Sequence, residues 1–350
     1  MPMDHEIIKD PTDMKTEVYN FVDDMEEYLR KRFKVQGEFR NIVFCGMGGS
    51  SIGGEIIADC AFNESRIPMV ILNFPEVPAW VGKRTLAFII SYSGNTKETI
   101  EMYETVKAKG AQCITLSVGG TIRDMAKEYG DTHIKLKPGA QPRSALGQML
   151  GSIANVVETI GGPKMKSEMK SHLGSMKKLR DNLSDTTNPK NLSYMISKKI
   201  GDRAPIIYST PQLAASAVRW KTQINENSKM IAFNSIVPEV NHNEIEAWVD
   251  EERRSYCVPV ILYEQRMSKE MKESVDTSIS VMRSKGVRPI IVNIKGRSVM
   301  ERTLRSVMIG DYVSLYLAYT TGVDPAEIKS IVTFKQRLAQ LFSRGRQKKK

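Results

Sequence analysis

The sequence predicts an α/β fold with two doubly wound domains, each built around a mostly parallel sheet. Apolar runs of strand length alternate with amphipathic helical patterns in both halves of the chain, which is typical of parallel α/β sheets. A lysine-rich helical stretch separates the halves, and two loops rich in glycine and serine follow strand-like runs of the first half. These observations predict two similar domains joined by a helical connector.

The first half contains five strand-like runs. They lie near residues 41–45, 68–72, 86–91, 112–117 and 132–136, with helices expected near residues 51–61, 95–109, 121–128 and 144–160. The last helix is supported by an apolar stripe at helical spacing, formed by Leu146, Leu150, Ile153, Val157 and Ile160. Such a stripe would bury one face of the helix against the sheet or a neighbouring helix.

The second half repeats this alternation. Strand-like runs lie near residues 205–209, 230–233, 257–263 and 288–294, with helices near residues 211–226, 242–250, 268–285 and 299–320. Apolar residues recur at helical spacing from Met165 to Leu179, and Asn188-Pro189 and Gly201-Asp202 then interrupt the chain. We therefore expect a helical extension at 1–34, a first domain at 35–164, a connector at 165–203, a second domain at 204–341 and a basic tail at 342–350.

Length and composition indicate an ordinary globular protein. The chain has 350 residues, of which 41% are hydrophobic and 26% charged, enough to bury sizeable cores. Apolar runs of about eighteen residues, as a membrane span needs, are absent, and the first residues lack a signal-peptide pattern, so a cytoplasmic location is expected. The four cysteines and four histidines are scattered without ligand spacing, so we expect free thiols and no metal.

The net charge of +11 is concentrated in part at the C-terminus. Five positive charges lie in residues 344–350, which we interpret as a frayed, solvated tail beyond the last helix rather than a nucleic-acid-binding segment. An anionic substrate accounts for some of the remaining positive charge without a polymer partner.

The two glycine- and serine-rich loops predict a phosphate-binding site. The first, Gly46 to Ser51, follows the strand-like run at 42–45, and the second, Ser91 to Thr96, follows the run at 86–90. Both would lie beyond the carboxyl ends of parallel strands, where such sheets bind ligands. Glycines allow close approach of the backbone to an anion, hydroxyls donate hydrogen bonds, and helix N-termini add unpaired N–H groups.

Nucleotide-binding loops fit these residues less well. The run Gly46-x-Gly48-x-x-Ser51 has serine where a dinucleotide fingerprint has a third small glycine or alanine, and no acidic residue closes the next strand. A Walker-type Gly-Lys-Ser/Thr run is absent, which argues against ATP hydrolysis.

Three further residues are candidates for chemistry. Arg143 is expected at the start of a helix, where a cation is unfavourable unless an anion is bound beside it; an arginine swung into solvent is the alternative. Glu226 is expected at the carboxyl end of a helix, where it could be a general base or simply a solvated glutamate. His242 lies between a strand-like run and an amphipathic turn, and it could transfer protons or merely pack at a helix start.

Five ordered segments resemble one family. They are Gly46-Met47-Gly48-Gly49-Ser50, Ser91-Tyr92-Ser93-Gly94-Asn95-Thr96, Pro142-Arg143-Ser144-Ala145-Leu146-Gly147, Asn225-Glu226-Asn227 and Asn241-His242-Asn243-Glu244. In this order they resemble the archaeal-type bifunctional phosphoglucose/phosphomannose isomerases of the sugar isomerase (SIS) domain superfamily, over roughly residues 35 to 340. The resemblance implies two flavodoxin-like SIS domains, each with a five-stranded parallel sheet, in a homodimer.

The resemblance also implies roles for particular residues. The sugar 6-phosphate would be bound by Gly48, Gly49, Ser50, Ser91, Ser93 and Thr96. Glu226 would move the proton between C1 and C2, Arg143 would stabilise the cis-enediolate, and His242 of the neighbouring subunit would assist ring opening. A C-terminal lysine of the family joins that last group, and Lys335 is the candidate here. No redox cofactor is implied. Ser51 replaces a glycine that is usual in the family.

Other functions remain as alternatives. The chain could be another SIS-domain sugar-phosphate isomerase, or a sugar-phosphate sensor without catalysis, which would need the serine loops but neither Glu226 nor His242. The presence of both proton-transfer candidates favours the enzyme.

Overall fold

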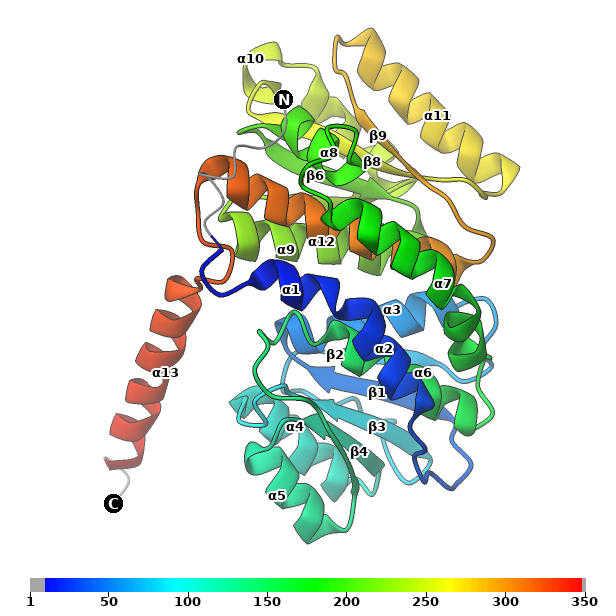
Figure 1. The fold of residues 1–350 in the computed structure, drawn as a ribbon. Helices are drawn as coiled ribbons and strands as arrows, with labels where there is room; N and C mark the ends of the chain where they lie inside the picture. The colour runs from blue at the N-terminus through cyan, green and yellow to red at the C-terminus, as the bar shows by residue number, and fades with distance from the viewer. Residues whose placement is uncertain (1–9, 348–350) are drawn as a thin grey trace.

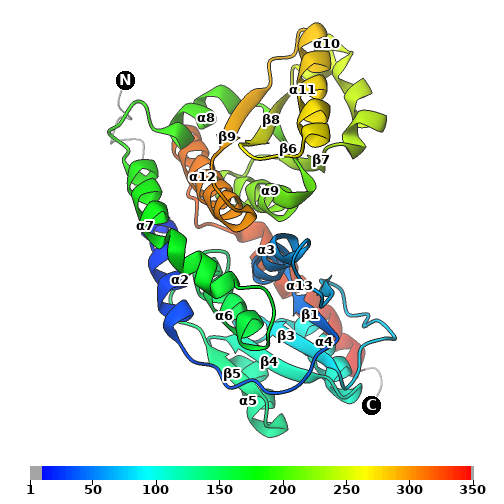
Figure 2. The ribbon, with the colours of Figure 1, turned by 90° about the vertical axis from the view of Figure 1, so that its right-hand side faces the viewer.

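Two parallel sheets face each other across a layer of helices (Figure 1). The computed structural model describes residues 10–347, apart from the side chains of Arg253 and of residues 339–347. From one side to the other the layers are outer helices, the first sheet, two pairs of inner helices, the second sheet and a further outer helix (Figures 1 and 2). The predicted fold class, α/β with two parallel sheets, is confirmed.

The first sheet has five parallel strands in the order β2-β1-β3-β4-β5, the flavodoxin-like order. The strands are β1 (Asn41–Gly46), β2 (Met69–Leu72), β3 (Thr85–Ile90), β4 (Gln112–Ser117) and β5 (Thr132–Lys135), each within one residue of its predicted bounds. The inner face is covered by α3 (Ile52–Ala61) and α6 (Leu146–Thr159), and the outer face by α4 (Lys97–Ala108) and α5 (Gly120–Tyr129). A 3-10 turn, η2 (Gly48–Ser50), links β1 to α3.

The second sheet has four parallel strands in the order β7-β6-β8-β9. They are β6 (Ala204–Ser209), β7 (Phe233–Ile236), β8 (Cys257–Glu264) and β9 (Ile290–Ile294). The inner face is covered by α9 (Ala214–Ser228), which follows the short turn η3 (Pro211–Leu213), and by α12 (Val299–Thr321). The outer side carries η4 (Glu239–His242), η5 (Glu244–Trp248), α10 (Glu251–Arg254) and α11 (Lys269–Ser284).

Three predictions for the second domain were wrong. The family resemblance implied a fifth strand, but residues 295–298 lead directly from β9 into α12, leaving no chain for another helix and strand. The strand expected near 230–233 lies at Phe233–Ile236, where it pairs with β6. The helix expected near 242–250 is replaced by η5 and α10, and the Asn243 side chain caps η5 by accepting from the Glu244 N–H.

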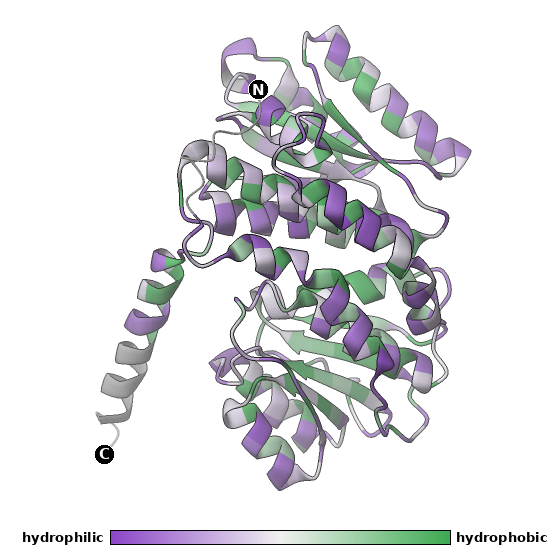
Figure 3. Cartoon of the chain, in the orientation of Figure 1, coloured by the Kyte–Doolittle hydropathy of each residue, from purple (hydrophilic) through white to green (hydrophobic). Residues whose placement is uncertain are grey.

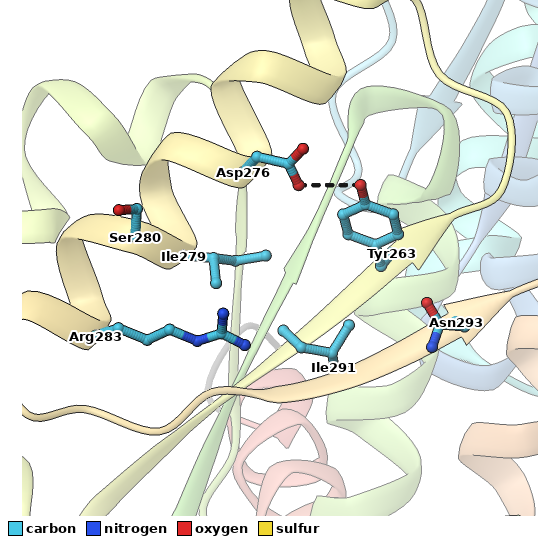
Figure 4. A pocket seen from close by; sticks show the side chains of 7 residues that line it. All are labelled: Tyr263, Asp276, Ile279, Ser280, Arg283, Ile291 and Asn293. Atoms are coloured by element: carbon cyan, nitrogen blue, oxygen red, sulfur yellow. Dashed lines mark hydrogen bonds between the residues drawn. The ribbon is translucent and has the colours of Figure 1, made fainter.

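A hollow lies on the outer face of the second domain, where the first domain has the helix α5 before its fifth strand. It lies between α11 and the strands β8 and β9 (Figure 4) and is lined by Tyr263, Asp276, Ile279, Ser280, Arg283, Ile291 and Asn293. In the first domain α5 packs against β4 and β5 at the corresponding place.

The predicted extension and connector form helices that cover the inner layer. They are α1 (Met14–Tyr19), α2 (Phe21–Arg30), α7 (Met165–Ser184) and α8 (Leu192–Ile200). The α2 helix packs closely on α6, because Gly147 and Gly151 present no side chain to it. The last helix, α13 (Lys329–Gln347), stands clear of the other elements in Figure 1. It includes residues 342–347, which were expected to form a tail beyond the last helix. Residues 348–350 lie outside the described range.

One apolar core is continuous through the inner helices of both domains. Buried side chains from α3, α6, α9 and α12 belong to a single cluster, and the strands are the most hydrophobic elements in Figure 3. Within residues 10–347, no helix is long and apolar enough to cross a membrane.

Candidate active site

The two hydroxyl-rich loops lie side by side at the carboxyl edge of the first sheet. Strands β1 and β3 are neighbours, with Gly46 opposite Ile90, so the loops that follow them emerge together. The Ser50 hydroxyl accepts a hydrogen bond from the Tyr92 backbone N–H at 3.3 Å, which joins the two loops directly. The Ser91 and Thr96 hydroxyls are 2.9 Å apart within the second loop.

The loops also present N–H groups for an anion. The first residues of α3 and α4 follow the two loops, and neither helix has a side chain capping its N-terminus. The positive end of the helix dipole at such helix starts favours negative charge. Ser50 and Ser91 are buried, whereas Gly48 and Ser93 are exposed, so the hydroxyls extend from the sheet edge to the surface.

The first loop also touches Arg143. A Cβ atom on Gly49 would lie 3.0 Å from the Arg143 Cα, so glycine allows this close approach. Tyr92 orders the segment that leads to Arg143, because its hydroxyl donates to the Lys137 carbonyl at 3.0 Å and accepts from the Ala140 N–H at 2.9 Å. Both hydroxyl-rich loops therefore help to position Arg143, the first through Gly49 and the second through Tyr92.

The Arg143 side chain is only 2% exposed and reaches into the second domain. Its Nε donates to Asn227 Oδ1 at 2.8 Å, its Nη2 donates to the Pro325 carbonyl at 2.8 Å, and its Nη1 lies 3.4 Å from Glu226 Oε2. Burial lowers the pKa of Arg143, and the Glu226 carboxylate opposes this effect. A guanidinium nevertheless keeps its charge in proteins, so the site holds a fixed cation and the solvated arginine is the wrong alternative.

Glu226 lies in the last turn of α9, as its sequence context predicted, and faces Arg143 across the junction between domains. Its side chain is 26% exposed, so the carboxylate is neither sealed in the core nor fully solvated. The carboxyl edge of the first sheet and the carboxyl end of α9 thus bring a carboxylate, a guanidinium and a group of hydroxyls to one place.

His242 and Lys335 do not join this group within one chain. His242 is exposed on η4, whose neighbouring residue Asn241 is hydrogen-bonded to Ser274 and Ser278 of α11 on the outer side of the second sheet. Lys335 is exposed on α13, which stands clear of the domains (Figure 1).

Sequence reasoning missed three contributors to the site. Asn227 was part of a recognised segment, but nothing local showed that its amide binds Arg143. The Lys229 ammonium contacts the backbone carbonyls of Glu226 and Pro325, and the Pro325 carbonyl also accepts from Arg143. Contacts to backbone carbonyls leave no pattern of side chains in the sequence, so neither residue could have been recognised from it. In the part of the chain that the structure describes, no group of three or more His, Cys, Asp or Glu side chains is placed to hold a metal.

Comparison with known proteins first defines the class. The second half of the chain, residues 189–338, matches a family model described as the bacterial phospho-glucose isomerase C-terminal SIS domain. The structure superimposes on the C-terminal domain of glucosamine-fructose-6-phosphate aminotransferase from Francisella tularensis with a TM-score of 0.70, at 13% identity, covering 90% of this chain and 98% of that one. The second half of the molecule thus matches an SIS domain, and the whole chain has the fold of that two-sheet structure.

Two relatives of nearly equal length define the family. The chain is 34% identical over 301 residues to the bifunctional phosphoglucose/phosphomannose isomerase of Aquifex aeolicus, covering 86% of this chain and 91% of the relative. It is 32% identical over 309 residues to the enzyme of the same name from Caldicellulosiruptor bescii, covering 86% and 90%. The chain belongs to the bifunctional phosphoglucose/phosphomannose isomerase family, as the sequence segments predicted.

Proposed function

We propose that this chain interconverts glucose 6-phosphate and mannose 6-phosphate with fructose 6-phosphate through a cis-enediolate. The observation that carries the proposal is the pairing of Arg143 with Glu226 across the domain junction, beside the loops that contain Ser50 and Ser91. A proton carrier, a fixed cation and an anion-binding surface are the groups that this reaction needs.

The 6-phosphate would bind at the carboxyl edge of the first sheet. Hydroxyls of Ser50, Ser91, Ser93 and Thr96, with N–H groups at the starts of α3 and α4, would donate to its oxygens. Gly48 and Gly49 allow the backbone to approach. Because the phosphate is remote from C1 and C2, its binding orients the sugar without taking part in the proton transfer.

Glu226 would transfer the proton and Arg143 would stabilise the intermediate. The ionised carboxylate takes the C2 proton of the open-chain aldose and returns it to C1, while the O1 and O2 oxygens exchange a proton as the enediolate becomes the ketose. Negative charge develops on those oxygens, and the Arg143 guanidinium is already fixed beside Glu226 to receive it. Its hydrogen bonds to Asn227 and Pro325 mean that little reorganisation is needed during the reaction.

Ring opening would use His242 of a second copy, with Lys335 as a further group. Glu226 ends α9 at the amino edge of the second sheet, whereas His242 follows β7 at the carboxyl edge. The 15 residues of α9 span about 22 Å, so these two side chains of one chain lie too far apart to act on one sugar. A homodimer in which one chain supplies His242 to the site of the other removes this difficulty.

The first experiment is turnover of fructose 6-phosphate in the presence of a metal chelator. We expect both glucose 6-phosphate and mannose 6-phosphate, with Glu226→Gln lowering kcat by about 10²–10⁴-fold. Glu104→Gln changes an exposed glutamate on α4 and serves as the control, with activity unchanged. Saturable binding without turnover would refute the proposal and favour a sensor, and turnover of a different ketose phosphate would indicate another SIS isomerase.

Mixing inactive variants tests the shared site. If His242 acts in the neighbouring chain, a hybrid of Glu226→Gln and His242→Ala chains contains one complete site. Random assortment then gives about a quarter of wild-type activity. If both residues act within one chain, every site in the hybrid lacks one of them, and the mixture stays as inactive as its parents.

A further inference from the structure

Lys229 occupies an unusual position at the end of α9. It is the residue that follows the helix, and its φ of 59° lies in the left-handed region. Glycine is the common residue at such a helix end, because a side chain makes this conformation less favourable. A lysine there indicates that its side chain makes contacts that offset this cost.

The Lys229 ammonium contacts the backbone on both sides of the candidate active site. Nζ donates to the Glu226 carbonyl at 2.7 Å and lies 3.2 Å from the Asn227 carbonyl, both in the last turn of α9. It also donates to the Asp324 carbonyl at 2.7 Å and lies 3.4 Å from that of Pro325, in the segment after α12. An ammonium has three N–H donors, so these four carbonyls share them.

These contacts converge on the two proposed catalytic side chains. One end of the link is the backbone of Glu226 itself, and the other includes the Pro325 carbonyl, which accepts from Arg143 Nη2 at 2.8 Å. The last carbonyls of a helix have no partners within the helix, and a cation near them is favourable. Lys229 therefore both completes α9 and joins it to the segment that binds Arg143.

We propose that Lys229 is a positioning residue, which fixes the backbone of Glu226 relative to the Pro325 carbonyl and thereby the distance between Glu226 and Arg143. This inference rests on the proposed isomerase function for its kinetic consequences. Lys229 touches neither the loop residues proposed for phosphate binding nor the reacting carbons, so its removal should affect the proton transfer more than substrate binding.

Lys229→Gly is the sharpest variant, because glycine adopts the left-handed backbone readily and only the side chain is lost. We expect kcat to fall by about 10–100-fold, as a displacement of about 1 Å can do, with KM for fructose 6-phosphate changed by less than about threefold. Ethylammonium, which replaces the lost group, should restore part of kcat, whereas tetramethylammonium, without N–H donors, should not. Lys178→Gln, at an exposed lysine on α7, should retain wild-type values.

A purely structural role gives a different result. In that case Lys229→Gly would lower thermal stability without changing kcat of the folded enzyme, or ethylammonium would fail to restore kcat, and either result overturns the proposal. Lys229→Gln, which keeps one amide donor group, should give a kcat between those of glycine and lysine.

Hydrogen exchange of the native protein separates this inference from the isomerase proposal. Amides near residues 224–230 and 322–328 should exchange faster in Lys229→Gly than in wild type, with little change in the strands of the first sheet. If wild type fails to convert fructose 6-phosphate, the isomerase proposal falls and these exchange rates decide alone whether Lys229 links the two segments. Unchanged exchange in both segments would overturn the link.

Discussion

A buried ion pair between α9 and α12 supports the helix that carries Glu226. Arg219 Nε and Nη2 donate to the two carboxylate oxygens of Asp311, both at 2.9 Å, and the side chains are 2% and 4% exposed. The Asp311 backbone carbonyl accepts from the Ser314 hydroxyl, which in turn accepts from Asn227 Nδ2. Asn227 in turn accepts from Arg143, so the Arg219–Asp311 ion pair is connected to Arg143 through buried hydrogen bonds.

Asp311→Asn should cost about 3–5 kcal/mol of unfolding free energy. The substitution keeps the shape of the side chain but leaves the Arg219 guanidinium buried without its counter-charge. A loss of this size is large against a typical total of about 5–15 kcal/mol. Replacing both partners, as Arg219→Met with Asp311→Leu, removes the unpaired charge and should cost much less than the single substitution.

Urea unfolding followed by circular dichroism measures this difference. Wild type, Asp311→Asn and the double variant are compared at equal protein concentration, because association would shift the apparent stability. Intrinsic tryptophan fluorescence provides a second probe, since Trp220 is fully buried on α9 beside Arg219. A cost below about 1 kcal/mol for Asp311→Asn, or a double variant as unstable as the single one, would refute the reasoning.

Three other substitutions test separate features. Gly147→Ala places a Cβ 2.2 Å from the Phe21 carbonyl and should lower the free energy of unfolding by about 1–3 kcal/mol in the same urea assay; an unchanged midpoint would contradict the close packing of α2 on α6. Arg143→Gln should lower kcat by about 10²–10³-fold in the fructose 6-phosphate assay, and a smaller loss would exclude it as the enediolate cation. Burial raises the pKa of Asp59 to about 6, from 3.8. The folded state therefore retains a proton that the unfolded state releases, and Asp59 lowers the free energy of unfolding as the pH rises from about 4 to 6, by about 3 kcal/mol in total. Asp59→Asn should remove this loss of unfolding free energy between about pH 4 and 6. Urea midpoints that depend on pH equally in wild type and Asp59→Asn would contradict the raised pKa of Asp59.

The alternation of apolar runs was sufficient to predict the first sheet. The three central strands β1, β3 and β4 are buried on both faces, so hydrophobic runs and strand bounds coincide there, as at Leu86–Ile90 in β3. The adjacency of the two serine-containing loops followed from chain order in a doubly wound sheet, because Ser50 and Ser91 each follow a central strand.

Apolar content misled the prediction of β7. Ile231 lies within the predicted run but before β7, and its side chain is 68% exposed, so its hydrophobicity does not report burial. The left-handed turn at Lys229 and the pairing of β7 with β6 determine where the strand begins. Neither is visible in a local pattern, since the first depends on a side chain that binds distant carbonyls and the second on a neighbouring strand.

The contact between Arg143 and Glu226 could not be predicted from local sequence. The two residues are separated by the whole connector, and they meet because α9 runs from the carboxyl edge of the second sheet to its amino edge, where it faces the first domain. Before the structure, only the family resemblance indicated that Arg143 and Glu226 belong to one site. Their roles in catalysis remain predictions.

The side chains at the carboxyl edges of the two sheets differ, and this difference explains why the phosphate-site candidate is built at the first sheet. At the carboxyl edge of the first sheet the residues after β1 and β3 are hydroxyl-bearing, and they face the end of α9. At the carboxyl edge of the second sheet, the corresponding position after β6 holds Thr210, which donates to the buried carboxylate of Glu264 at the end of β8. Arg302 donates to Glu264 at 2.7 Å, so that edge is filled by a buried internal ion pair rather than by groups free to bind a phosphate. The second domain therefore contributes to the site through the far end of α9, and its own carboxyl edge, with His242, would be available to a neighbouring chain if the proposed dimer forms.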